Sequence, residues 1–244
     1  MRAYREQAIV LRTYKLGETD RILHLLSTGQ GKVRAVAKGV RRPGSRFGGR
    51  LEVLSHVDMQ LHPGRTLDIV NQVELVHAFA GLRADWSRSA CAQAMAEAVD
   101  RIAQEGERHV GLFVLLRETL LALEAEPADP AAVLDAALLR LASTAGYHPH
   151  LQACAACGAP GAHAVFHLDA GGLLCATCAP VGAQPLAAGV LEGLRTLAQA
   201  RWEDLDAWAA GVDGRTRRAC AALVSSYLTH HLGAPLRAWD LVPR

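Results

Sequence analysis

Four cysteines in the C-terminal half form two pairs, each with the spacing Cys-x-x-Cys, and 17 residues separate the pairs. The cysteines are Cys154, Cys157, Cys175 and Cys178. A Cys-x-x-Cys turn directs two sulfur atoms toward one point, and Zn²⁺ favours four thiolates in a tetrahedron. The spacing therefore predicts one zinc ion bound by all four cysteines. Because four protein ligands leave no position for a reacting water, we expect this zinc to be structural.

Other uses of these thiols fit the sequence less well. A redox Cys-x-x-Cys motif needs a βαβ context, which the surrounding pattern lacks. Met1–Leu11 has charged residues and no apolar stretch, so we expect no secretory signal and a cytoplasmic location, where disulfides are disfavoured. His163 and His167 are expected at the surface rather than on the metal. Cys91 and Cys220 stand singly in alanine-rich stretches and are expected to be buried.

The second candidate site is a basic segment near the N-terminus. Between residues 32 and 50 there are seven cations and no carboxylate: Lys32, Arg34, Lys38, Arg41, Arg42, Arg46 and Arg50. Residues 1–80 carry 13 Lys and Arg against 7 Asp and Glu, whereas the whole chain has a net charge of only +2. We interpret the segment as a loop that follows a phosphate backbone, with Phe47 and Tyr14 stacking on bases. The alternative is a solvated basic loop without a ligand.

The elements that would position this segment are short strands. Residues 6–76 contain five apolar or alternating runs separated by Gly, Pro and Asp. This pattern predicts a small closed β-barrel, of which the OB-fold is one nucleic-acid-binding form, and an SH3-like barrel fits it too. One of these runs is expected at Leu51–Leu61.

From about residue 85 the apolar period becomes helical. Asp129 followed by Pro130 predicts a helix start, and Gly146 predicts its end. The fold class is therefore α+β and multidomain. The expected parts are a barrel at 1–80, an α-helical domain at 81–150 and 183–240, a zinc module at 151–182, and residues 241–244. These last four residues match half of a common protease-cleavage tag and are given no structural weight.

Several stretches resemble the RecO family of bacterial recombination mediators. The resemblance covers nearly the whole chain, and its specific parts are the run through Arg41 and Arg42 together with the cysteine block. The matching stretches are Tyr14–Asp20, Ile22–Leu26, Gly31–Pro43, Ser45–Phe47, Ala145–Pro149, Leu151 and the two cysteine pairs.

The resemblance implies an N-terminal OB-fold, a zinc module and a nucleoid-associated protein that is not an enzyme. It implies binding to single- and double-stranded DNA and annealing of complementary strands. The implied protein partners are RecR and, in some members, RecF, with which the family loads RecA. Members also dock the C-terminal tail of single-stranded DNA-binding protein on the helical domain. Some relatives have an arginine where this chain has Ala137, and Arg140 lies near but is not assigned that role.

Two other classes of protein are the alternatives. An RNA- or ribosome-associated zinc-ribbon protein would show the same residue pattern, and only the resemblance favours DNA. A metal-dependent hydrolase is disfavoured because the chain has no His-Glu-x-x-His, Gly-x-Ser-x-Gly or Walker motif. The longest apolar run, Val110–Leu116, is too short to span a bilayer, so no membrane contact is expected.

Overall fold

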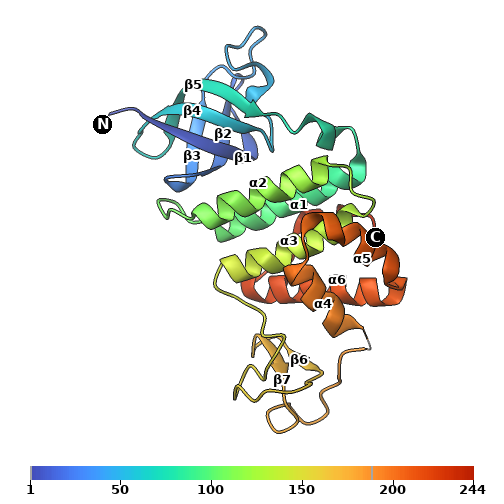
Figure 1. Ribbon diagram of the computed structural model, residues 1–244. Coiled ribbons are helices and arrows are strands. Elements are labelled where there is room, and N and C mark those ends of the chain that lie inside the picture. Colours follow the sequence, from blue (N-terminus) through green and yellow to red (C-terminus); the bar gives the residue numbers. More distant parts are fainter. Residues whose placement is uncertain (1, 188) are drawn as a thin grey trace.

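A computed structural model describes residues 2–187 and 189–244. The chain begins with a barrel, continues into a bundle of helices, and carries a small two-stranded sheet at the end of the bundle farthest from the barrel (Figure 1). None of the helices in the described ranges is long and apolar enough to cross a membrane.

Five strands close the barrel in the order β1-β2-β3-β5-β4. Their bounds are β1 Tyr4–Leu16, β2 Asp20–Ser27, β3 Gly31–Ala37, β4 His56–His62 and β5 Asp68–His77. The β3–β5 pair is parallel and the other pairs are antiparallel. This confirms the small five-stranded barrel. Alternate strand residues such as Ala8, Val10, Leu23 and Leu25 point inward and are fully buried, as the period of two requires.

The strand expected at Leu51–Leu61 begins later than predicted. Gly48–Leu51 forms a 3-10 helix, Leu54 has a φ of 74°, and β4 starts only at His56. The apolar residues of this stretch serve two different cores, which is why they do not alternate. Leu51 packs into the barrel, whereas Leu54 packs with the helices.

Among the described residues, six α-helices form the second part. Their bounds are α1 Trp86–Ile102, α2 Val110–Glu124, α3 Pro130–Thr144, α4 Val190–Gln199, α5 Leu205–Gly211 and α6 Gly214–Leu232. The predicted start of α3 is confirmed, because the Asp129 carboxylate accepts a hydrogen bond from the Ala132 N–H. Helix α3 is central and contacts α1, α2, α4, α5 and α6. The short α5 was not predicted, since seven residues carry too little periodicity.

The barrel is joined to the helices by backbone contacts as well as side chains. The Lys32 N–H donates to the Gln104 carbonyl at 3.1 Å. Gly31 has a φ of 65°, and a Cβ at this position would lie 1.8 Å from the Glu107 carbonyl oxygen. Only glycine allows the β2–β3 turn to come this close to the loop that follows α1.

Residues 241–244 are part of the packed structure, contrary to the expectation that they have no structural weight. Val242 is buried. The Arg244 guanidinium lies 3.9 Å from the centre of the Trp239 ring and donates two hydrogen bonds, of 2.8 and 2.9 Å, to the buried Asp135 carboxylate. The sequence did not reveal this partner because 109 residues separate the two.

Candidate metal centre and nucleic-acid interface

The four cysteines come together as predicted. Their sulfur atoms all lie within 4.8 Å of one another, and the Cys157 and Cys175 sulfurs are 3.8 Å apart. A tetrahedral zinc with Zn–S bonds of about 2.3 Å has sulfur–sulfur edges of about 3.8 Å, so the cluster has the size that zinc requires. Elsewhere in residues 2–187 and 189–244, no group of three or more His, Cys, Asp or Glu is gathered in this way.

Short backbone contacts hold the two cysteine turns. Gly158, with a φ of 73°, closes the first turn by donating to the Cys154 carbonyl at 2.8 Å. The Ala155 N–H donates at 2.7 Å to Leu173 in β7 (Gly172–Leu174), which pairs with β6 (Val165–His167). The hairpin thus brings the second pair of cysteines to the first.

The electrostatics of the cluster favour a cation. The backbone N–H of Cys175 lowers the pKa of Cys154 to about 6, despite some burial. The sulfurs of Cys175 and Cys157 raise the pKa of Cys178 to about 12. The thiols therefore oppose one another's ionisation, and a divalent cation that accepts thiolates would remove this conflict. His163 instead contacts the Ala159 carbonyl at 2.8 Å, and neither His163 nor His167 belongs to the cluster.

Two of the seven predicted DNA-binding cations are engaged by the helical domain. Lys32 Nζ lies 2.9 Å from an oxygen of Asp100, and Arg34 Nε lies 2.5 Å from an oxygen of Glu105. Only 16 % of the Lys32 side chain is exposed. These contacts make Lys32 less available to a phosphate, and the phosphate-binding role of Lys32 and Arg34 stays a prediction. The reason is tertiary: the outer face of β3 lies against the end of α1 and the loop after it.

The other five cations lie together on residues 38–50, which we call the basic ridge. They are Lys38, Arg41, Arg42, Arg46 and Arg50, and within the described ranges none has a carboxylate partner within 4.0 Å. The ridge is a series of turns rather than the extended loop that its glycines suggested. The Arg41 N–H donates to the Thr19 carbonyl at 2.9 Å, and the Gly39 N–H donates to the Asp20 carboxylate at 2.7 Å.

The two aromatic residues proposed to stack on bases differ in exposure. Phe47 is 2 % exposed and belongs to the barrel core, so the prediction that it stacks on bases is wrong. Its ring anchors the basic ridge to the barrel, where burial stabilises the fold more than exposure would. Tyr14 is 40 % exposed on β1, with the Arg12 guanidinium 5.1 Å from its ring centre. Its role in stacking stays a prediction.

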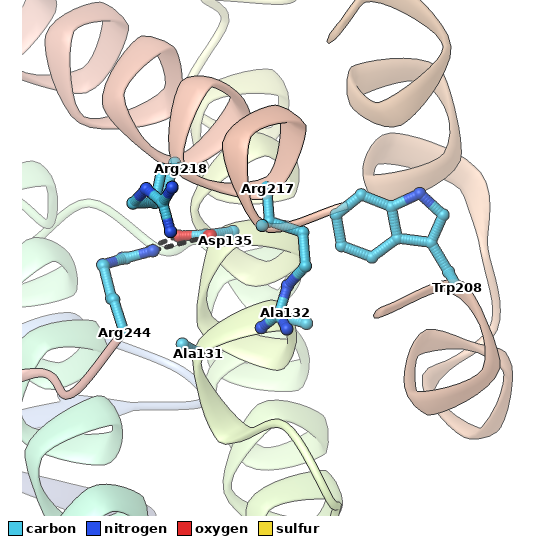
Figure 2. A pocket seen from close by; sticks show the side chains of 9 residues that line it. Ala131, Ala132, Asp135, Trp208, Arg217, Arg218 and Arg244 are labelled. Atoms are coloured by element: carbon cyan, nitrogen blue, oxygen red, sulfur yellow. Dashed lines mark hydrogen bonds and ion pairs between the residues drawn. The ribbon is translucent and has the colours of Figure 1, made fainter. Parts of the chain in front are cut away.

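An apolar pocket with basic residues around it lies between α3, α5 and α6, and the sequence reading missed it. Figure 2 shows Trp208 on one side and Arg217, Arg218 and Arg244 around Ala131, Ala132 and Asp135. The adjacent arginines at the start of α6 were the signal in the sequence, but only the fold places them beside Trp208.

The two positions considered for tail docking are not available at this surface. Ala137 is fully buried in α3. Arg140 donates to the carbonyls of Leu197 and Ala200, and its guanidinium lies 4.0 Å from the centre of the Trp202 ring. Burial lowers the pKa of Arg140 from its ordinary value. Its donors are therefore directed inward.

Comparisons with known proteins agree with this arrangement. Residues 1–79 match the family described as Recombination protein O N terminal, and residues 83–240 match Recombination protein O C terminal. The chain is 43 % identical over 246 residues to the DNA repair protein RecO of Thermobifida fusca (strain YX), with 100 % of both chains covered. RecO proteins are known as non-enzymatic mediators. With both parts matched and a full-length relative at this identity, the chain belongs to the RecO family of DNA repair and recombination proteins.

Proposed function

We propose that this protein binds DNA through the basic ridge of its barrel and anneals complementary single strands without ATP. In this role it works with RecR, and with RecF, to load RecA onto DNA coated by single-stranded DNA-binding protein. The observation that carries the proposal is the set of five cations on the basic ridge of a RecO-family chain, which have no carboxylate partner among the residues that the structure describes.

The charge of the basic ridge explains why binding and annealing belong together. Arginine and lysine that neutralise phosphates release counterions, and this contribution is independent of sequence. Two strands whose phosphates are partly neutralised repel each other less, so base pairing proceeds without a nucleotide-driven step. The absence of a Walker motif in the sequence is consistent with this expectation.

In the same proposal the cysteine cluster holds one structural zinc through Cys154, Cys157, Cys175 and Cys178. The ion would supply four bonds to thiolates and thereby fix residues 151–182. Support comes from the sulfur–sulfur distances and from the conflict among the four thiols, which a divalent cation relieves.

The apolar pocket of Figure 2 is the surface that we assign to the C-terminal tail of single-stranded DNA-binding protein. An acidic peptide with an apolar end needs an apolar floor and nearby cations. Trp208 and Ala132 provide the first, and Arg218 provides the second, whereas Arg217 is paired with Asp129. Arg140 takes no part in this assignment, because its Nη2 donates to the carbonyls of Leu197 and Ala200.

The experiment is annealing of labelled complementary oligonucleotides together with a salt titration of binding. The variant replaces Arg41, Arg42 and Arg46 with Ala, and its matched control replaces Arg65, Arg201 and Arg215, which carry the same charge elsewhere. Each phosphate contact to a single strand contributes about −0.7 to the slope of log K against log salt, so the first variant should flatten that slope by up to about 2. Equal slopes for both variants, or annealing that requires ATP, would contradict the proposal.

An RNA-associated role is the alternative, and parallel assays separate the two. The same oligonucleotide sequences made as RNA should anneal more slowly than DNA at equal protein concentration. Faster annealing of RNA would favour the alternative.

A further inference from the structure

A cleft separates the barrel from the helical domain on the side of β1. It has a volume of about 290 Å³ and lies between Arg12 and Thr13 of β1, Gln93 of α1, and Arg237 and Leu241 of the C-terminal segment. No pattern in the sequence points to Arg12 or Arg237, because each is an isolated cation and more than 200 residues separate the two.

An irregularity in β1 places Arg12 at this cleft. Val10 pairs with Leu25 and Arg12 pairs with His24, so one residue, Leu11, is extra in β1. Such a bulge changes the direction in which the following side chains point, and bulges are common beside functional sites. Here Leu11 turns into the core that includes the helices, while Arg12 is left exposed at the mouth of the cleft.

The cleft also contains two carboxylates, but both are already neutralised. Glu97 accepts hydrogen bonds from the Arg237 and Ala238 N–H groups at 3.1 and 2.9 Å, and from the Arg101 guanidinium at 2.6 Å. The Asp100 carboxylate likewise lies within 3.0 Å of one nitrogen each from Lys32 and His24.

The two cleft arginines have no such partners. Across the described ranges, the guanidinium groups of Arg12 and Arg237 have no carboxylate within 4.0 Å. The charge that remains available to a ligand is therefore positive on both walls of the cleft.

We propose that this cleft binds the phosphodiester backbone of a single DNA strand that continues from the basic ridge. The inference rests on the proposed function and extends it to a second contact, between the two domains. Arg12, Tyr14 and Leu16 are exposed along β1, and the strand ends at the turn against which Arg41 is held.

The length of β1 between the cleft and the basic ridge suits a continuous path for the DNA strand. The five steps along the chain from Arg12 to Gly17 span about 17 Å at ~3.3 Å per residue. An extended single DNA strand would place a few phosphates over this stretch. Tyr14 lies in the middle with its ring exposed, where it can stack on a base.

The test is a salt titration of binding to a labelled oligo-dT strand, using the full-length protein. The variant carries Arg12→Ala and Arg237→Ala. Its control carries Arg65→Ala and Arg215→Ala, which remove the same charge from exposed positions outside the cleft. A third protein carries Arg12→Lys and Arg237→Lys, which keeps the charge in place. We expect the slope of log K against log salt to flatten by about 1.4 in the first variant and to stay near that of the original protein in the other two.

The outcomes separate this inference from the proposed function. If the original protein binds and the cleft variant keeps its slope, the cleft is not on the DNA path, although the basic ridge can still be. If the slope of log K against log salt flattens equally in the cleft variant and in the control, the effect comes from overall charge and the inference is overturned. If the original protein shows no salt-dependent binding, the proposed function fails and the cleft inference fails with it.

Discussion

The barrel and the cysteine module are both small β-structures, but different forces hold them. The barrel has five strands of 7 to 13 residues around a closed apolar core. The module has two strands of three residues each, and the turns beside them carry the cysteines, of which Cys154 is buried and Cys157 is exposed. A two-stranded hairpin of this size is marginal in water, so we expect the module to depend on the proposed metal, whereas hydrophobic burial stabilises the barrel.

The largest expected effect comes from removing one metal ligand. Cys175→Ser should abolish stoichiometric zinc and unfold residues 151–182, because structural zinc binding contributes on the order of 10 kcal/mol to folding. Hydrogen exchange should show loss of protection there, with the strands of the barrel unchanged. Ala176→Ser, at the exposed neighbouring residue, is the matched control. If the zinc-free protein keeps its protection from hydrogen exchange in the module, the barrel and the module do not differ in the way described.

Truncating a core side chain of the barrel should destabilise the barrel rather than the cysteine module. Leu25 is fully buried in the barrel, and Leu25→Ala should lower the free energy of unfolding by about 2–5 kcal/mol through lost burial and a cavity. Urea unfolding of the zinc-loaded protein measures this loss. Leu75→Ala, on the exposed surface of β5, should cost far less. If both leucines cost the same, the barrel does not depend on its core in the way proposed.

The contact of Asp100 in α1 with Lys32 and His24 in the barrel tests whether the barrel is stable without the helical domain. Asp100 is desolvated, which raises its pKa, but hydrogen bonds from Lys32 and His24 outweigh burial and hold the pKa below its ordinary value. A carboxyl whose pKa is depressed on folding stabilises above its unfolded pKa of about 3.9, and that stabilisation is lost as the pH falls through the folded value. Asp100→Asn should therefore cost about 1.5–3 kcal/mol near pH 7.

The free energy of unfolding that Asp100→Asn loses near pH 7 should shrink toward zero in acid. Chemical unfolding of both proteins at several pH values below 5 measures this convergence. Asp85→Ala, which removes a carboxylate from the start of the same helix, serves as a comparison because it should not bring the same pH dependence of the junction. A difference between Asp100→Asn and the original protein that is independent of pH would mean that the ion pair does not operate at the junction.

The smallest effect is chemical rather than energetic and concerns thiol reactivity. Burial raises the pKa of Cys91 to about 12 and that of Cys220 to about 11, so neither thiol forms much reactive thiolate at neutral pH. Alkylation counted by mass spectrometry should find little modification in the zinc-loaded protein and four modified cysteines after chelation. Early modification of Cys91 would show that the helical core opens more readily than its packing implies.

Local patterns in the sequence determined those features that depend on near neighbours. The two Cys-x-x-Cys turns predict the four-cysteine cluster because a turn of four residues sets the direction of both sulfurs. The start of α3 at Asp129 and Pro130 follows from one side chain and one backbone N–H three residues apart. The five strands of the barrel follow from a period of two interrupted by turns.

Only the tertiary structure decided which charges and rings are available to a ligand. Lys32 and Arg34 look identical to the other basic residues in the sequence, but Asp100 and Glu105 reach them only after α1 docks on β3. Phe47 sits among glycines and arginines, yet the barrel has room for its ring and buries it. Availability depends on contacts between segments that are distant in the chain, and no local pattern encodes those contacts.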